Sequence, residues 1–190
     1  MYRRTADART RLVERMGEIA RGGPVAGPVD DPESFFAQYY ATVGQDDLRV
    51  RQVEDLAGGA LAHVRLAGRR RPGSPVVRVY NPDPSTDGWE SSHTFVEIVN
   101  DDMPFLVDST AMVVTARGHY IHLTVHPVLR VRRDGDGDLG RILDADDAAS
   151  DVLQESFLRL EIDRMSDPAT LEALRDELLR VLRDVRAAVE

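Results

Sequence analysis

The stretch VNDDMPFLVDS, residues 99–109, decides the fold, because it joins one apolar run to another through two acids and a proline. It could be an acidic active site, or it could be the place where a strand turns into a helix. In the second interpretation Asp102 caps the helix, since an acid suits the positive helix end, and Pro104 lies in the first turn. Capping explains the stretch without catalysis. We therefore predict a strand over residues 93–99 and a helix over residues 103–117.

The residues that follow predict an antiparallel α+β unit. Alternating apolar residues favour strands over 120–132 and 157–163, and a shorter apolar run favours a strand over 76–80. Asp167 and Pro168 form a typical helix start, with an N-cap residue followed by proline.

The first third of the chain reads as helices. Asp31 and Pro32 begin one of them, and its aromatic stripe is typical of a core or a seam with a partner helix. That stripe consists of Phe35, Phe36, Tyr39 and Tyr40. A further helix is expected over 47–66, and the breaker AGRRRPGSP at 67–75 then marks a boundary. We predict a helical segment over 1–70 and a second domain over 71–190.

Composition excludes several classes of function. The net charge of −9 opposes binding to a long nucleic acid, and the short basic run at 69–71 is expected to be a solvated loop. No run approaches the roughly 18 to 20 apolar residues of a membrane span, and the charged N-terminal residues do not form a secretory signal. The chain has no cysteine and no lysine, so thiol and Schiff-base chemistry are excluded from it. A cytoplasmic location is expected.

Three motifs suggest ligands, and each has a better structural explanation. GDGDLG at 135–140 matches a dinucleotide loop literally, but its acids would repel a pyrophosphate, so a flexible connection between strands is predicted. The same acids resemble a calcium loop, yet Leu139 stands where glycine is needed. His122 and His126 share a strand face about 13 Å apart, too far for one metal ion. No catalytic, cofactor-binding or metal-binding residue is predicted.

Several longer stretches resemble the N-terminal region of the large bacterial NAD-specific glutamate dehydrogenases, from about residue 31 to residue 190. They are VNDDMPFLVDS, IHLTVHPVLRVRRDGDGDL, ESFLRLEIDR, LLRVLRDVRAAVE, VRVYNPDPSTDGW and AGGALAHVRLAGRR. The resemblance implies a parent enzyme that deaminates L-glutamate oxidatively to 2-oxoglutarate and ammonia with NAD. It places the catalytic domain downstream, so that this chain needs no cofactor of its own.

The resemblance also implies ACT-like domains, which sense small ligands and pack in pairs. The expected fold is a ferredoxin-like, ACT-like antiparallel sheet of about four strands, with two helices on one face and the helical segment in front. DDMPFL then occupies the place of the acid-x-Pro-Gly-Leu turn of ACT domains. The candidate regulatory turn comprises Asn100, Asp101, Asp102, Met103, Pro104 and Phe105.

The function that these observations favour is a non-catalytic regulatory or assembly domain of NAD-specific glutamate dehydrogenase. Its partners would be the rest of that chain, further copies in a homo-oligomer, and a small amino-acid effector, with no nucleic acid and no membrane. One alternative is a stand-alone amino-acid-binding ACT protein. A third is a small enzyme that uses the carboxylates of Asp101, Asp102 and Asp108.

Three structural expectations follow from this fold. The strand over 76–80 should pair antiparallel with residues 95–99. The connection through helix 103–117 should be a right-handed crossover that leaves a gap in the sheet, and the strand over 157–163 should fill it, between the strands over 93–99 and 120–132. The sheet face away from the two helices should carry Tyr120, His122, His126, Phe157 and Arg159. We expect self-association through that face or a sheet edge, or contact with another domain of the parent enzyme. Phe105 should fill the ligand's space or enter the core, so that glutamate does not bind tightly at the turn.

Overall fold

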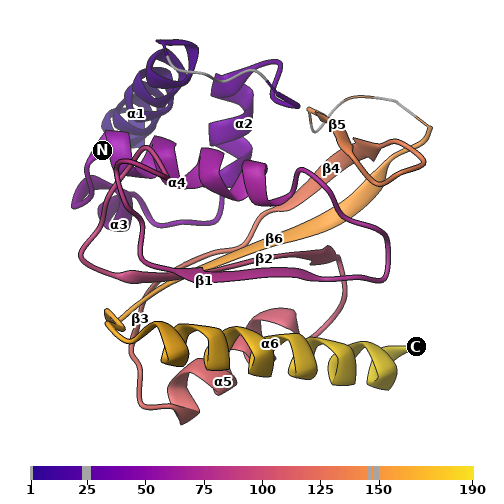
Figure 1. The fold of residues 1–190 in the computed structure, drawn as a ribbon. Helices are drawn as coiled ribbons and strands as arrows, with labels where there is room; N and C mark the ends of the chain where they lie inside the picture. The colour runs from indigo at the N-terminus through magenta and orange to yellow at the C-terminus, as the bar shows by residue number, and fades with distance from the viewer. Residues whose placement is uncertain (1, 23–26, 145–146, 148–149) are drawn as a thin grey trace.

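The computed structural model describes residues 2–22, 27–144, 147 and 150–190, and these form three layers (Figure 1). A sheet lies in the middle, with helices packed on both of its faces. The described helices are α1 (Tyr2–Gly22), α2 (Pro32–Tyr39), α3 (Gln45–Arg49), α4 (Val53–Leu66), α5 (Leu106–Ala116) and α6 (Pro168–Val189). The described strands are β1 (Val76–Tyr80), β2 (Thr94–Asp101), β3 (Ile121–Val125), β4 (Val128–Arg133), β5 (Leu139–Ile142) and β6 (Leu153–Ile162).

The sheet order confirms the predicted strand neighbours, but the described sheet has six strands rather than about four. Among the described residues it runs β1-β2-β6-β4-β5, with β3 also paired to β6, and every pair is antiparallel. Val76 lies opposite Val99, and Tyr80 lies opposite Phe95. Strand β6 lies between β2 and the pair β3 and β4, as predicted.

Two helix starts agree with the sequence. The carboxylate of Asp31 accepts hydrogen bonds from the backbone N–H groups of Glu33 and Ser34, at 3.0 and 3.3 Å. Asp167 accepts one from the N–H of Ala169 at 3.2 Å. A proline follows each cap in the first turn, where it disturbs no helical hydrogen bond.

The predicted strand over 120–132 is two strands, because it breaks at His126 and Pro127. Proline has no N–H to donate to a neighbouring strand, and the Pro127 carbonyl accepts instead from the N–H of Phe157 at 2.9 Å. A bulge between Ile121 and Leu123 also shifts the register. As a result Ile121 packs on the side of α5 and α6, while Leu123 packs on the other side.

The helical segment covers the second face of the sheet, which was expected to be free. One core lies between the sheet and α5 and α6, and another joins α1, α2 and α4 to residues such as Val99 and Phe157. Phe157 is fully buried and Arg159 is 5% exposed. Self-association through these two residues is therefore wrong, because their own chain covers them. The division into 1–70 and 71–190 stays a prediction, and in the structure the two parts share a core.

One further expectation needs correction, and another is confirmed. The helix expected over 47–66 is interrupted, because residues 50–52 separate α3 from α4, and Val50 is exposed. The glycine motif at 135–140 belongs to a hairpin that joins β4 to the unpredicted strand β5. A hairpin offers no helix N-terminus to a pyrophosphate, so the motif is a connection between strands. None of the described helices is both long enough and apolar enough to cross a membrane.

Candidate functional site

The candidate turn does not cap helix α5 as the sequence suggested. Asn100 and Asp101 still belong to β2, and the helix begins only at Leu106. The residue in the cap position is Phe105, which makes no side-chain capping bond, and Asp102 is exposed. The N-cap role predicted for Asp102 is wrong, because the chain makes a further turn before the helix starts.

Phe105 is the only residue other than glycine with positive φ among those described, at 67°. This left-handed conformation costs an ordinary side chain roughly 1–2 kcal/mol. The ring is 62% exposed, so it does not enter the core. Phe105 thus adopts a backbone conformation that usually favours glycine.

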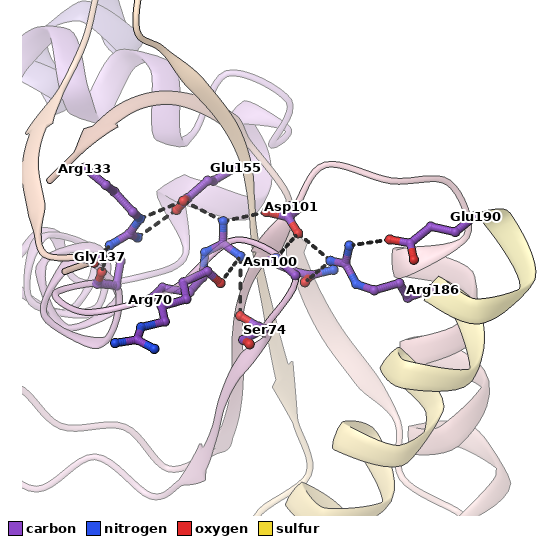
Figure 2. A network of polar contacts seen from close by, with 12 residues as sticks. Arg70, Ser74, Asn100, Asp101, Arg133, Gly137, Glu155, Arg186 and Glu190 are labelled. Carbon is purple, nitrogen blue, oxygen red and sulfur yellow. Dashed lines mark hydrogen bonds and ion pairs between the residues drawn. The ribbon is translucent and has the colours of Figure 1, made fainter. Parts of the chain in front are cut away.

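Within the turn, Asp101 accepts hydrogen bonds from several distant parts of the chain (Figure 2). Its Oδ1 accepts from Arg70 Nη2 at 2.7 Å, and its Oδ2 accepts from the N–H of Gly73 at 2.7 Å and from Arg186 Nη2 at 2.5 Å. Burial acts to raise the pKa of Asp101, but the hydrogen bonds from Arg70 and Gly73 outweigh it and hold this pKa below its ordinary value. All of its oxygen atoms are therefore engaged within the chain.

Glu155 extends this network into the interior. It accepts from Arg70 at 2.7 Å and from two nitrogens of Arg133 at 2.7 and 2.8 Å. The side chains of Arg70 and Glu155 are fully buried, and that of Arg133 is 2% exposed. The Asp101 network, which comprises Arg70, Asp101, Arg133, Glu155 and Arg186, ties the linker after α4 to β2, β4, β6 and α6. Arg70 is thus a buried structural residue, and the prediction of a solvated loop is wrong at this position.

A second feature is a cavity of about 510 Å³ between α3, α4 and the sheet. The helices, the β1–β2 loop and strands β2, β3 and β6 all contribute to its walls. We call it the seam cavity. It is lined by Tyr40, Asp47, Val50, Arg51, Gln52, Asp55, Leu56, Trp89, Ser91, Ser92, His93, Phe95, His122, Leu123, Val125, Arg159 and Glu161.

Arg159 is the buried cation of the seam cavity. Its guanidinium carbon lies 4.8 Å from the centre of the Trp89 ring and 4.4 Å from that of Phe95. Its nearest acid is Glu97, at 3.7 Å, which is too far for a hydrogen bond. Burial raises the pKa of Glu97, even though Arg159 acts to lower it. The positive charge of Arg159 is therefore only partly compensated.

Two adjacent glycines in α4 make room for this arrangement. A Cβ at Gly58 would lie 2.5 Å from the Cβ of Trp89, and one at Gly59 would lie 2.1 Å from the guanidinium nitrogens of Arg159. Glycine inside a helix ordinarily destabilises it relative to alanine. In the structure these glycines allow the helix to pack against the tryptophan and the arginine.

The mouth of the cavity carries further charged groups. Arg51 donates to both oxygens of Glu161, at 2.9 and 3.0 Å, which neutralises that carboxylate. His93 lies 3.3 Å from Glu161, and its ring centre is 4.7 Å from that of His122. His122 in turn contacts Asp163 at 2.8 Å. Among the described residues no three His, Cys, Asp or Glu side chains form a group that could hold a metal ion.

Sequence reasoning missed the seam cavity. It placed Arg159 on an open polar face and gave Trp89 no role beyond a loop. A usable signal was present, because Arg159 and Glu161 interrupt a strand that is otherwise apolar and expected at the centre of the sheet. The candidate turn and the seam cavity are separate sites, since no residue of 100–105 lines the cavity.

The fold and these two sites define an ACT-like α+β domain with additional N-terminal helices. The family model described as "Glutamate dehydrogenase, ACT1 domain" matches residues 35–178. The chain belongs to this family.

Two curated relatives carry the name NAD-specific glutamate dehydrogenase. The one from Pseudomonas aeruginosa is 43% identical over 155 residues, which cover 82% of this chain and 10% of the relative. The one from Halomonas elongata is 36% identical over 183 residues, which cover 96% of this chain and 11% of the relative. The chain therefore spans about a tenth of the length of these relatives.

Proposed function

We propose that this domain regulates or assembles a cytoplasmic NAD-specific glutamate dehydrogenase and takes no part in its chemistry. The parent enzyme would convert L-glutamate and NAD to 2-oxoglutarate, ammonia and NADH. The relatives carry that name, and the matched residues cover only about a tenth of their length, which supports this assignment.

The observation that carries the proposal is the position of the seam cavity between two layers of the domain. One wall belongs to α3 and α4, and the other belongs to the sheet. A molecule bound there contacts both layers, so its binding energy depends on how they pack. A ligand that prefers one packing shifts the domain towards it, which is the physical requirement for regulation.

The Asp101 network offers a route from the sheet to other parts of the chain. Arg186 lies near the end of α6 and is bonded directly to Asp101 at the end of β2. A movement of β2 would therefore change this contact with α6. The carboxylate of Asp101 is held by two arginines and a backbone N–H, so it is a poor acid–base catalyst.

The test compares the whole parent enzyme with a form that lacks the residues of this chain. We expect the shortened enzyme to keep glutamate-dependent NADH formation but to change either the number of subunits found by light scattering or its rate response to added amino acids. An unchanged number of subunits together with unchanged responses would refute the proposal.

A point variant covers the case in which the shortened enzyme does not fold. The parent enzyme with Asp101→Ala should assemble or respond differently from the unmodified enzyme, because Arg186 of α6 loses its ion pair with the end of β2. The same assembly and responses in this variant would also refute the proposal.

A further inference from the structure

A second cavity lies between α1 and the stretch that runs from α3 into the start of α4. Its volume of about 440 Å³ falls within the range of roughly 300–1,000 Å³ that is usual for small-molecule sites. Among the described residues that line it, four are arginines, Arg11, Arg15, Arg49 and Arg51, and one is an acid, Glu54. We call it the arginine cavity.

Helical spacing brings polar side chains to the arginine cavity from two elements. Arg11 and Arg15 are four residues apart on α1, so they lie on one face of that helix. Gln45 and Arg49 repeat this spacing on α3. The cavity therefore receives positive charge from both helices.

One of the four arginines is already engaged within the chain. Arg51 donates to both oxygens of Glu161, at 2.9 and 3.0 Å, and to the carbonyl oxygen of Asp47. Arg51 and Gln52 also line the seam cavity, so they form the wall that the two cavities share. The role of Arg51 is to hold this wall rather than to bind a ligand.

Arg15 and Arg49 are held much less firmly. Arg15 Nη2 lies 4.0 Å from Glu54, and Arg49 Nη1 lies 3.8 Å from Asp46. Neither distance is short enough for a hydrogen bond. The side chains of the two arginines are 65% and 56% exposed, and ion pairs of this exposed kind are weak. Both guanidinium groups can therefore turn to a stronger acceptor.

The charge of the arginine cavity is opposite to that of the whole chain. Its four arginines and one glutamate give the lining a formal charge of +3, whereas the chain carries −9. Charge of one sign around a concave space raises the local concentration of ions of the other sign. The ligand class that this cavity favours is anionic.

A phosphate group fits the arginines better than a carboxylate does. It carries nearly two negative charges near neutral pH and offers three acceptor oxygens, whereas a carboxylate has one charge and two oxygens. Guanidinium groups bind both by paired hydrogen bonds. Groups that come from different helices match an acceptor whose oxygens point in several directions. Leu12, Leu48 and Val53 supply an apolar wall for the rest of the molecule.

We propose that the arginine cavity binds a small molecule that carries a phosphate group, with the phosphate held between Arg15 of α1 and Arg49 of α3. Arg11 adds a further positive charge from the face of α1 that carries Arg15. The inference goes beyond the proposed function, because regulation or assembly of the parent enzyme does not require this site. It also involves neither the turn at 100–105 nor the buried charges of the seam cavity.

The experiment titrates the purified chain with pyrophosphate in a phosphate-free buffer of low ionic strength and measures the heat of binding by calorimetry. Tricarballylate, which carries three carboxylates and no phosphate, is titrated in the same way. We expect saturable binding of pyrophosphate that is tighter than that of tricarballylate. Added sodium chloride should weaken it, because salt screens exposed charges.

Two pairs of variants locate the site. The double variant Arg15→Gln and Arg49→Gln should bind pyrophosphate about ten-fold more weakly, on the scale of two lost ion pairs. Its control is Arg180→Gln with Arg183→Gln, which changes the net charge equally at exposed positions of α6. Glu54→Gln should tighten binding about two-fold or more, since it removes the acid of the cavity. Glu172→Gln, at an exposed position of α6, is the control for that change.

Four outcomes would overturn the proposal. They are the absence of saturable pyrophosphate binding, tricarballylate binding that is equally tight or tighter, a double variant that binds as well as its control, and no difference between Glu54→Gln and Glu172→Gln. None of these outcomes touches the regulatory or assembly role, because the shortened parent enzyme tests that role independently.

Discussion

Replacing Asp101 by alanine should destabilise the domain by about 2 kcal/mol, whereas the same change at Asp102 should be nearly neutral. Asp101 accepts three hydrogen bonds, and hydrogen bonds to charged groups contribute roughly 1.5–3 kcal/mol each. Their loss is not additive. In the variant, Arg70 keeps its hydrogen bond to Glu155, and Arg186 keeps those to Asn100 and Glu190. The N–H of Gly73 is exposed and can bind water instead. The cost of leaving the buried Arg70 with one acid fewer dominates the total.

Urea unfolding followed by circular dichroism measures this difference in the free energy of unfolding. Asp102 is the matched control, because it is the next residue, carries the same charge and is exposed. Its replacement should change the free energy of unfolding by no more than about 0.5 kcal/mol. If Asp102→Ala costs as much as Asp101→Ala, then Asp102 does cap the helix and the role given to the network is incorrect.

The pH dependence gives a second check on Asp101. Its pKa is lowered in the folded state, so its ionised form contributes stability that is present above the unfolded value, near about 3.9. This contribution is lost as the pH falls through the lowered folded value. The stability difference between the wild type and Asp101→Asn should therefore be constant near neutral pH and shrink below about pH 4. A difference that grows as the solution becomes acidic would contradict this assignment.

Three further predictions concern other residues. The variant Phe105→Gly should be more stable than Phe105→Ala by about 1 kcal/mol in urea unfolding, since only glycine relieves the left-handed strain, and equal stabilities would argue against that strain. Gly58→Ala should destabilise the domain by about 1–3 kcal/mol and shift the fluorescence of Trp89, because the new Cβ meets this side chain. Gly22→Ala is the control: its Cβ meets nothing within 4 Å, so both stability and fluorescence should stay unchanged. Burial, aided by Arg159, lowers the pKa of His63 to about 3, so the free energy of unfolding should fall as the pH drops from about 6.5 towards that value. His63→Phe should reduce this pH dependence, and an unchanged pH dependence in the variant would show that the pKa of His63 is not lowered.

The sequence predicted the features that depend on local chemistry or on chain topology. Asp31 and Asp167 cap helices because an acid before proline is a typical helix start. Strand β6 fills the gap that the connection through α5 leaves between β2 and β3. The same reasoning failed at Asp102, since capping depends on where the chain completes its turn, and the backbone of Phe105 delays the helix.

The sites depend on contacts between residues far apart in the chain, which a single sequence does not reveal. Arg70 looked like part of a solvated run, but 85 residues separate it from its buried partner Glu155. Arg159 looked like part of an open polar face because nothing in the residues showed that the first four helices fold back over the sheet. The seam cavity exists only once that layer is in place.

Glutamate-dependent NADH formation by the purified chain tests the central claim, that the domain serves the parent enzyme without catalysing its reaction. The chain is incubated with L-glutamate and NAD, and the parent enzyme serves as the positive control. We predict that NADH formation equals that of a blank without protein, while the parent enzyme produces NADH. A glutamate-dependent rate that rises in proportion to the concentration of the purified chain would contradict the account.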